Sequence, residues 1–205
     1  SNIFMIKNKN FFDIIIIGSG IAGLSIASEL SKEASVCILE KEKIPSYHST
    51  GRSFAFYIES YGNKIIRKLT TASKDFFLQH SEKTKVNKLL KKRGIIYIGN
   101  TNQKKNIKKM YKEIVNKNNN IELFDKKETL KKISCLNEKY IESSIYDPDA
   151  SDIDVNSMYN IHLKNLKTNN GKLFTDINIT KILKNKNWVI HTDKEIFATD
   201  LIVNA

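Results

Sequence analysis

A glycine-rich turn near the start of the chain constrains its fold more than any other feature. It follows an aromatic and β-branched run at 11–17, which is typical of a strand, and it opens a segment at 21–30 that is typical of a helix. The turn has the form G-x-G-x-x-G and consists of Gly18, Ser19, Gly20, Ile21, Ala22 and Gly23. In such a unit the first glycine makes the tight turn, the second admits a pyrophosphate, and the third lets helix and strand pack closely. We therefore predict a strand–turn–helix unit that binds dinucleotide phosphates at the helix N-terminus.

An acidic residue at the end of a second apolar run strengthens this interpretation. Residues 36–39 are typical of a short strand, and a right-handed crossover would make the two strands parallel neighbours. Glu40 ends this run, where a carboxylate accepts hydrogen bonds from adenosine ribose hydroxyls. Glu40 argues against NADP because a carboxylate repels a 2′-phosphate; Lys41, also included in the predicted site, softens that argument without reversing it. The motif leaves NAD and FAD both open, and the alternative without a cofactor is a glycine-rich turn beside a surface glutamate.

Helical and strand-like patterns alternate after this unit. Apolar residues recur at helical spacing over 65–80 and predict one long amphipathic helix with basic residues on its other face. Asp125 followed by Glu128 is typical of a capping box at the start of another helix. Further elements are predicted in order as a strand at 95–98, a helix at 107–115 and a strand at 121–124.

The end of the chain returns to a β-rich pattern. After a helix capped by Asp154, short strands are predicted at 172–174, 177–183, 188–191, 195–197 and 201–203. We therefore predict an α/β fold with a discontinuous Rossmann-type core formed by residues 1–80 and 151–205. Residues 81–150 are predicted to form an inserted α+β region on the substrate side. Because the chain stops at Ala205 directly after a strand-like run, we expect it to be truncated at the C-terminus.

Composition limits the remaining classes of function. The formal charge of +12 could indicate an acidic partner such as nucleic acid, but the lysines are scattered among asparagines, which favours a solvated surface over a nucleic-acid site. Cys37 and Cys135 have neither metal-ligand nor redox-pair spacing, so we predict no metal site and a reducing, cytoplasmic location. The longest apolar run is too short to span a bilayer, and we predict no transmembrane segment.

A polar segment after the second strand carries a family resemblance. The residues are Tyr47, His48, Ser49, Thr50, Gly51, Arg52 and Ser53, followed by the run Ser60-Tyr61-Gly62. Hydroxyl donors at the start of a helix, a glycine that permits close approach and a cation near a pyrophosphate suit a cofactor site. For His48 and Arg52 the alternative is a surface cap with a salt bridge. The segment resembles the FAD-dependent D-amino-acid oxidase (DAO) superfamily, and is most similar to its D-arginine dehydrogenase and glycine/D-amino-acid oxidase-like branch.

The resemblance extends over most of the chain and implies further roles. It includes the segments at 69–73, 147–150 and 200–205. It implies that residues 48–53 contact FAD on its flavin side, that Tyr61 lies near the substrate, and that the backbone of Ile179 lies against the adenine. For Tyr61 and Ile179, a packed aromatic and an ordinary strand residue are the alternatives. Ile95 stands where the D-arginine branch has an acidic residue and Phe56 where it has a histidine, which argues against a strongly basic substrate.

The resemblance implies an activity for the intact protein. We expect it to bind a small-molecule substrate, an amino acid, and to deaminate a D-amino acid oxidatively by hydride transfer to flavin N5, with the electron acceptor left open. Related flavoproteins oxidise a 2-hydroxy acid, glycerol 3-phosphate or a secondary amine, and these remain alternatives. A non-catalytic nucleotide-binding fragment or a basic polyanion-binding module is the alternative from another class. The family's carboxylate-binding arginine would lie beyond Ala205, so this chain by itself is expected to be inactive.

Overall fold

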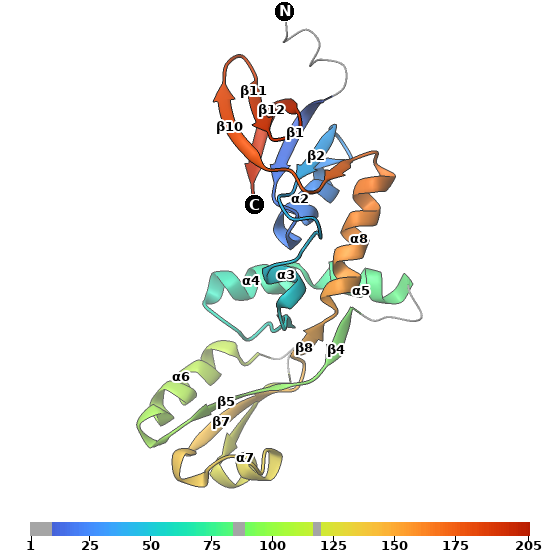
Figure 1. The fold of residues 1–205 in the computed structure, drawn as a ribbon. Helices are drawn as coiled ribbons and strands as arrows, with labels where there is room; N and C mark the ends of the chain where they lie inside the picture. The colour runs from blue at the N-terminus through green and yellow to red at the C-terminus, as the bar shows by residue number, and fades with distance from the viewer. Residues whose placement is uncertain (1–9, 84–88, 117–119) are drawn as a thin grey trace, which may run out of the picture. The chain divides into compact units, whose positions relative to one another are not determined.

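The computed structural model describes residues 10–83, 89–116 and 120–205, and the chain divides into two compact units (Figure 1). The first, here called the sheet unit, combines the residues up to Ser53 with Val155–Ala205; the second, the insert unit, is Phe54–Asp154. The sequence pattern had placed these divisions after residues 80 and 150. Residues 54–80 group with the insert unit because their strand β3 (Phe56–Tyr57) pairs with β8 (Ser151–Ile153). The roles assigned to the parts stay predictions.

A six-stranded sheet forms the centre of the sheet unit, in the order β10-β11-β12-β1-β2-β9 (Figure 1). Its strands are β1 (Phe11–Ile17), β2 (Val36–Leu39), β9 (Lys172–Phe174), β10 (Ile179–Lys184), β11 (Trp188–Thr192) and β12 (Ile196–Asn204). Strands β12, β1, β2 and β9 run parallel, whereas β10 and β11 add an antiparallel hairpin beside β12. The predicted α/β class and the parallel pairing of the first two strands are confirmed.

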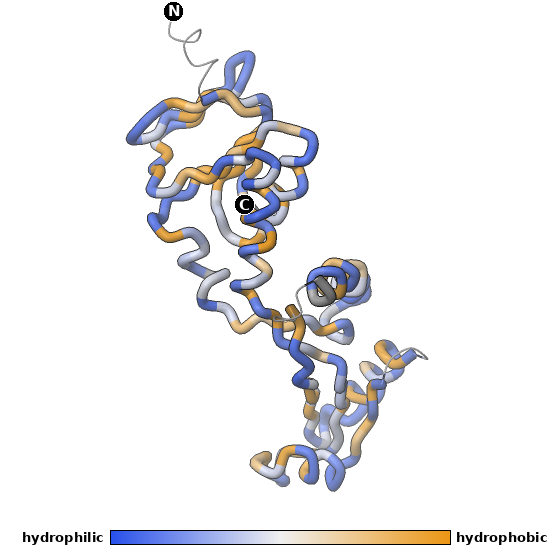
Figure 2. The backbone as a smooth tube through the Cα atoms, turned by 90° about the vertical axis from the view of Figure 1, so that its right-hand side faces the viewer, coloured by the Kyte–Doolittle hydropathy of each residue, from blue (hydrophilic) through white to orange (hydrophobic). Residues whose placement is uncertain are grey.

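Strand β1 is uninterruptedly apolar from residue 14 to residue 17, and both faces of this stretch are covered. Successive side chains of a strand point to opposite faces. Ile16 packs in a cluster with Leu24 of α2 (Ile21–Leu30) and Leu166 of α8 (Val155–Thr168). Ile15 packs on the other face, in a cluster that includes Phe197. Figure 2 shows hydrophobic stretches of the backbone alternating with hydrophilic ones along the chain. A parallel strand buried on both faces requires such an uninterrupted apolar run.

Strand β12 corrects one prediction. The pattern indicated two separate strands at 195–197 and 201–203, but Ile196–Asn204 is continuous. Thr199, one of the polar residues between the two apolar runs, is fully buried. Its hydroxyl lies 3.0 Å from the carbonyl oxygen of Asp13 and 2.9 Å from that of Leu201. Because these bonds satisfy the hydroxyl, a polar residue is accommodated inside the strand.

The insert unit contains two small antiparallel sheets, with orders β3-β8-β4 and β5-β7-β6. The remaining strands are β4 (Leu90–Lys92), β5 (Ile95–Gly99), β6 (Glu122–Asp125) and β7 (Ser143–Asp147). Ile107 and Ile114 of α6 (Lys104–Ile114) pack with Ile145 of β7 in its core. Helix α7 (Lys126–Lys132) begins with the predicted capping box, in which Asp125 and Glu128 each accept the other's backbone N–H. That prediction is confirmed.

The long helix predicted over 65–80 is wrong in two respects. The structure has two helices, α4 (Lys64–Ala72) and α5 (Lys74–Lys83), separated at Ser73. The hydroxyl of Ser73 donates to the carbonyl of Leu69, and its N–H is shared among three carbonyls of the last turn. Serine side chains compete in this way with the regular helical bonds. The apolar face of α4 is also not buried, since Ile65 is 69% and Leu69 61% exposed.

Among the residues that the structure describes, no helix is both long enough and apolar enough to cross a membrane.

Candidate functional site

The glycine-rich turn lies where three parallel strands end. Gly18 follows β1 with a φ of +102°, and its N–H donates to the carbonyl of Leu39 at the end of β2 over 2.9 Å. Ala205, directly after β12, donates its N–H to the carbonyl of Ile17 over 3.0 Å. The carboxyl ends of neighbouring parallel strands, at a point where the strand order reverses, form the usual binding edge of an open α/β sheet.

Two of the three glycines are required by the chain itself. A Cβ atom on Gly18 would lie 2.2 Å from the carbonyl oxygen of Ala205, and one on Gly23 would lie 2.1 Å from that of Gly18. Gly20 differs, because a Cβ there would meet only the Thr50 hydroxyl at 3.5 Å, an ordinary contact distance. The described protein therefore leaves the space beside Gly20 open, at the position where the dinucleotide fingerprint lets a pyrophosphate approach.

Glu40 stands beside this turn as an ionised carboxylate. Its Oε2 accepts the N–H and the hydroxyl of Ser19, over 2.8 Å and 2.5 Å, and its Oε1 accepts the N–H of Glu42 over 2.8 Å. Burial raises the pKa of the Glu40 carboxyl, but the hydrogen bonds from Glu42, Ser19 and Lys41 outweigh this effect, so the pKa lies below its ordinary value. The site therefore carries a fixed negative charge at the end of β2, suited to hydroxyl donors and unsuited to a phosphate.

The segment after Glu40 also reaches the turn. The hydroxyl of Thr50, in the short helix α3 (Ser49–Arg52), accepts the N–H of Ile21 in the first turn of α2 over 3.0 Å. The segment itself requires a glycine at position 51, since a Cβ atom added to Gly51 would lie 2.5 Å from the carbonyl oxygen of Ser46. The Ser53 hydroxyl lies 3.4 Å from the carbonyl of Thr50. The side chain of Ser49 lies outside the described part of the structure.

His48 and Arg52 make surface contacts. The Nε2 of the exposed His48 lies 3.0 Å from a carboxylate oxygen of Glu42. The guanidinium of Arg52 lies 4.6 Å from the centre of the Tyr47 ring, a cation–π contact. Lys41 is exposed. The contact of His48 with Glu42 matches the surface alternative, and His48 and Arg52 both belong to the segment that borders the turn.

Tyr159 is a site residue that the sequence did not indicate. Its hydroxyl donates to the carbonyl oxygen of Ser19 over 3.0 Å, and its side chain is buried against α2. Burial raises the pKa of its phenol. Helical spacing shows only that Tyr159 belongs to the apolar face of α8. No signal in the sequence shows that its hydroxyl reaches a turn 140 residues earlier.

The two remaining predicted residues lie elsewhere. Ile179 begins β10 and packs against the cluster that contains Ile15 and Phe197, as an ordinary strand residue would. The chain just before it runs beside Glu40, since the N–H of Ile177 donates to the Glu40 carbonyl over 2.9 Å. Tyr61 belongs to the insert unit, where its side chain is 61% exposed in the loop between β3 and α4. The structure therefore brings the glycine turn, Glu40 and Thr50 together within the sheet unit, whereas Tyr61 belongs to the insert unit.

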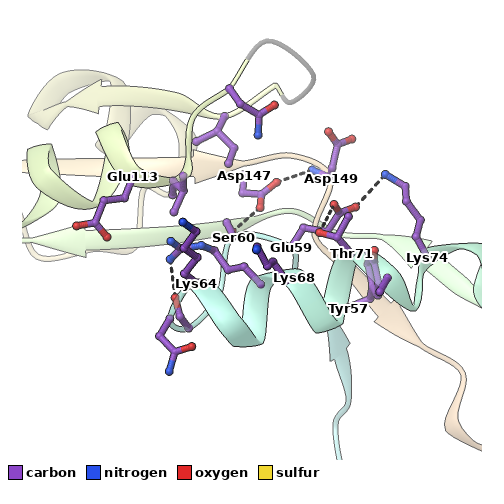
Figure 3. Close-up of a pocket in the computed structure, with 17 residues that line it drawn as sticks. Tyr57, Glu59, Ser60, Lys64, Lys68, Thr71, Lys74, Glu113, Asp147 and Asp149 are labelled. Carbon is purple, nitrogen blue, oxygen red and sulfur yellow. Dashed lines mark hydrogen bonds and ion pairs between the residues drawn. The ribbon is translucent and has the colours of Figure 1, made fainter.

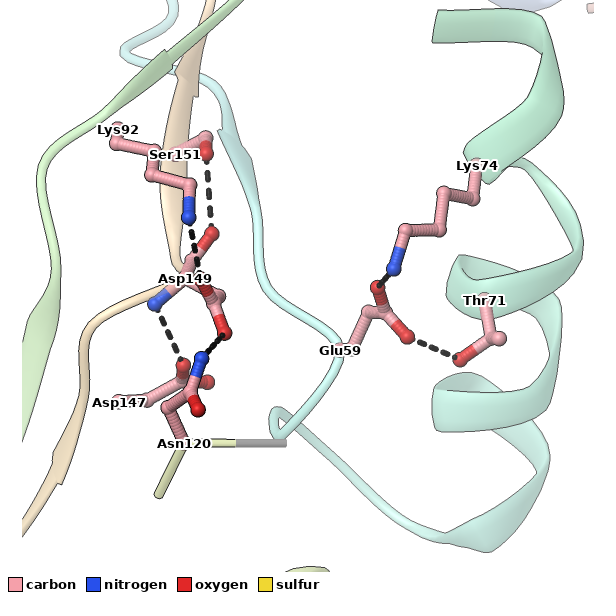
Figure 4. Close-up of polar contacts among 8 residues, drawn as sticks. All are labelled: Glu59, Thr71, Lys74, Lys92, Asn120, Asp147, Asp149 and Ser151. Carbon is pink, nitrogen blue, oxygen red and sulfur yellow. Dashed lines mark hydrogen bonds and ion pairs between the residues drawn. The ribbon is translucent and has the colours of Figure 1, made fainter. Parts of the chain in front are cut away.

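The insert unit has a hollow of its own, with a volume of about 1250 Å³ (Figure 3). Lys64, Arg67 and Lys68 of α4 line one wall, and the ends of α6 and β7 contribute to the other. Two acidic groups of this hollow already have partners: Glu59 accepts Lys74 and Thr71, and Asp149 accepts Lys92 and Asn120 (Figure 4). Among the described residues, no ion pair involves the three α4 cations, although Arg67 donates a hydrogen bond to the carbonyl of Gly62 over 2.6 Å.

The residues of the sheet unit fit an adenine dinucleotide cofactor. The open space beside Gly20 admits a pyrophosphate, α2 directs its N-terminus to the same place, and Glu40 offers hydroxyl acceptors. This fit rests on the backbone N–H groups at the N-terminus of α2 and on the open space beside Gly20.

Comparisons with solved structures show the same fold in known flavoproteins. An L-α-glycerophosphate oxidase from Mycoplasma pneumoniae with FAD bound has a TM-score of 0.81 at 19% identity, over 96% of this chain and 54% of that chain. A glycine oxidase from Geobacillus kaustophilus has a TM-score of 0.78 at 18% identity, over 96% and 55%. An L-proline dehydrogenase from P. horikoshii has a TM-score of 0.78 at 22% identity, over 96% and 53%. The chain thus spans about half the length of these proteins.

Sequence comparisons place the chain in a family. An uncharacterized protein of Methanocaldococcus jannaschii is 39% identical over 64 residues, which is 31% of this chain and 17% of that protein. The DAO family, described as FAD dependent oxidoreductase, matches residues 13–205. With the glycine turn, the parallel sheet and the carboxylate at the end of β2, this match over nearly the whole chain shows that it belongs to the DAO family of FAD-dependent oxidoreductases.

Proposed function

We propose that the sheet unit binds the ADP half of FAD and that the whole protein oxidises a small amino acid. The observation that carries the proposal is the open space beside Gly20, at the carboxyl edge of the parallel sheet and next to the ionised Glu40. The pyrophosphate would lie at the N-terminus of α2, and Glu40 would accept the ribose hydroxyls. The backbone at Ile179 would face the adenine, which the hydrogen bond between Ile177 and Glu40 supports because it holds this segment beside the ribose site.

The protein's own residues would supply orientation. When bound, the flavin would supply the redox step by accepting a hydride from the substrate carbon that carries the amine. Residues 48–53 border the glycine turn and would lie along the cofactor toward the flavin. Tyr61 would donate a hydrogen bond to the substrate from the insert unit, and its exposed phenol supports this role. The imino acid formed would hydrolyse to a keto acid and ammonia.

The local charge supports a substrate without a cationic side chain. Phe56 and Ile95 replace the histidine and the acidic residue that the resemblance to D-arginine dehydrogenases would lead one to expect. The Arg93 guanidinium lies 5.4 Å from the centre of the Phe56 ring and bonds to Asp152. Neither Phe56 nor Ile95 offers an acidic partner for a cationic side chain. We therefore propose a neutral or small amino acid, as the names of two structural neighbours, glycine oxidase and L-proline dehydrogenase, also suggest.

A second candidate substrate is glycerol 3-phosphate. Lys64, Arg67 and Lys68 form a basic wall in the hollow of the insert unit, and a phosphate ester would suit it (Figure 3). A glycerophosphate oxidase is also among the structural neighbours. A direct comparison of substrates distinguishes the two candidates.

The test is the absorption spectrum of the purified full-length protein before and after anaerobic additions. The panel contains glycine, L-proline, neutral D-amino acids, D-arginine, a 2-hydroxy acid and glycerol 3-phosphate. We expect oxidised flavin bands that a neutral amino acid bleaches and D-arginine does not. Bleaching by glycerol 3-phosphate alone would replace the amino-acid proposal by the second candidate.

Two outcomes count against the proposal as a whole. If the flavin bands are present but no amino acid and no hydroxy compound bleaches them, both proposed substrate classes are excluded. A preparation that shows no flavin band even after incubation with FAD would remove the cofactor. A Gly20→Ala variant serves as a control, because it should lose flavin while remaining folded.

A further inference from the structure

A buried carboxylate is hydrogen-bonded to the loop that carries Tyr61. Asp147, at the end of β7, is only 4% exposed, and Ser60 is 3% exposed. The Ser60 hydroxyl donates to Asp147 Oδ2 over 2.6 Å (Figure 3). The other oxygen of Asp147 accepts the N–H of Asp149 over 3.0 Å (Figure 4). Burying a carboxylate is costly unless it is hydrogen-bonded, so these two bonds are what make the arrangement stable.

A third hydroxyl completes the cluster. The phenol of Tyr97, on the neighbouring strand β5, lies 3.1 Å from the Ser60 hydroxyl. Burial raises the pKa of the Tyr97 phenol, the bond to Ser60 lowers it, and the nearby Asp147 and Tyr61 raise it further. We call Ser60, Tyr97 and Asp147 the loop clamp.

The loop is also fixed on its other side. Gly62 has a φ of +82°, and Asn63 caps α4 by accepting the N–H groups of Ile65 and Ile66. Arg67 donates to the carbonyl of Gly62 over 2.6 Å. Tyr61 thus stands between two anchored residues while its own side chain is 61% exposed. Such a fixed backbone below an exposed phenol is typical of a site in which a hydrogen-bonding group is held in place before its ligand binds.

We propose that Ser60, Tyr97 and Asp147 are positioning residues that hold the Tyr61 phenol in place for the substrate. This inference rests on the proposed function, in which Tyr61 contacts the substrate. Ser60 transmits the constraint because it is the chain neighbour of Tyr61 and the only one of the three in the loop itself. Without its hydroxyl, Asp147 would keep a buried charge with one donor fewer, and the loop would be free to rearrange.

The first test measures the loop directly and needs no substrate. Hydrogen exchange of the backbone amides at 59–63 is followed by mass spectrometry in the full-length FAD-bound protein. We expect Ser60→Ala to exchange faster there, and Ser60→Thr, which keeps the hydroxyl, to exchange as the wild type does. Ser144→Ala is the matched control: it removes another buried serine hydroxyl of the insert unit, bonded to Thr129 rather than to the loop. Unchanged exchange at 59–63 in Ser60→Ala would overturn the clamp.

The second test asks whether the clamp acts through Tyr61. With the amino acid that bleaches the flavin best, we expect Ser60→Ala to raise the substrate dissociation constant about tenfold, and Tyr61→Phe by a similar factor. The double variant should be no weaker than Tyr61→Phe alone. Independent, multiplying effects would show that Ser60 does not act through Tyr61 and would overturn the inference.

Failure of the inference differs from failure of the proposed function. If no amino acid bleaches the flavin, the proposed function fails, and the exchange measurement still decides whether the clamp holds the loop. If an amino acid bleaches the flavin but Tyr61→Phe leaves its dissociation constant unchanged, the function stands and the positioning role is overturned.

Discussion

At the scale of single residues, the three glycines of one motif have different physical reasons. Gly18 and Gly23 are required because carbonyl oxygens of the chain occupy the space of their Cβ atoms. Gly20 has open space on the protein side, which agrees with the proposal that a pyrophosphate approaches there. This difference separates variants that damage the fold from variants that damage the cofactor site.

Alanine at the first two glycines should therefore affect different properties, namely stability at Gly18 and FAD affinity at Gly20. Gly18→Ala is expected to lower the free energy of unfolding by about 1–3 kcal/mol or more, because of its positive φ and the contact with Ala205. Gly20→Ala should change it by less than about 1 kcal/mol yet weaken FAD binding at least tenfold. Denaturant unfolding of the apoproteins and FAD titration measure both effects. Wild-type FAD affinity in Gly20→Ala would show that the pyrophosphate does not approach there.

Glu40 predicts a dependence of stability on pH. Because its folded-state pKa is below the ordinary value, its contribution is fully present above the unfolded-state pKa of about 4.3 and is lost as pH falls through the folded-state value. Thermal unfolding of the wild type should therefore lose more stability below about pH 4.3 than that of Glu40→Gln. Glu29→Gln, on the exposed side of α2, is the matched control and should follow the wild type. Parallel pH profiles for the wild type and Glu40→Gln would contradict this account.

At the scale of elements, the site depends on how α8 docks against α2. Both helices cover the same face of the sheet, with Leu24 and Leu166 in one cluster. Tyr159 adds a polar contact at this interface, since its hydroxyl holds the Ser19 carbonyl. Ser19 in turn donates twice to Glu40, so α8 is linked to Glu40 through one residue.

Tyr159→Phe should loosen the turn while keeping the helix packing. It removes the donor to the Ser19 carbonyl, and we expect a loss of about 0.5–1.5 kcal/mol of unfolding free energy. FAD affinity should fall by roughly 2–10-fold, because Ser19 and Glu40 are no longer held in one geometry. Tyr140→Phe, on an exposed tyrosine of the insert unit, is the control for removing a phenol. Equal FAD affinity in both variants would limit Tyr159 to a packing role.

At the scale of the whole molecule, most of the excess positive charge belongs to a different unit from the glycine turn. The chain carries +12, and most of the excess lies in the insert unit, where lysines are frequent on α6 and α7. At the glycine turn, by contrast, the proposed cofactor site consists of backbone N–H groups and the anionic Glu40. Scattered lysines give a diffuse field rather than a defined anion site.

Salt should therefore distinguish cofactor binding from nonspecific attraction. We expect FAD affinity to change by less than about threefold between 50 mM and 200 mM salt, while any binding of duplex DNA falls by orders of magnitude. Fluorescence titrations with FAD and with a labelled duplex at both salt concentrations measure this. A steep salt dependence of FAD binding would indicate that lysines rather than the glycine turn hold the cofactor.

Much of the sheet unit follows from local sequence. The apolar run of β1, the glycine spacing and the position of Glu40 predict a parallel strand pair with a turn between, because each feature acts within a short stretch of chain. The capping box of α7 is local in the same sense. The resemblance of residues 47–53 indicated the family that the comparison over residues 13–205 confirms.

Tertiary structure decided what depends on distant partners. The continuity of β12 depends on the distant carbonyl of Asp13, which satisfies the buried hydroxyl of Thr199. The break at Ser73 is different, because it involves a local bond to Leu69 that helical periodicity does not register. Tyr159 and Asp147 gain their roles from residues far away in sequence, at Ser19 and Ser60. A pattern of residue types specifies which side chains are apolar and how they recur along the chain. It does not specify which hydroxyl meets which carbonyl, because that depends on how elements distant in sequence pack together.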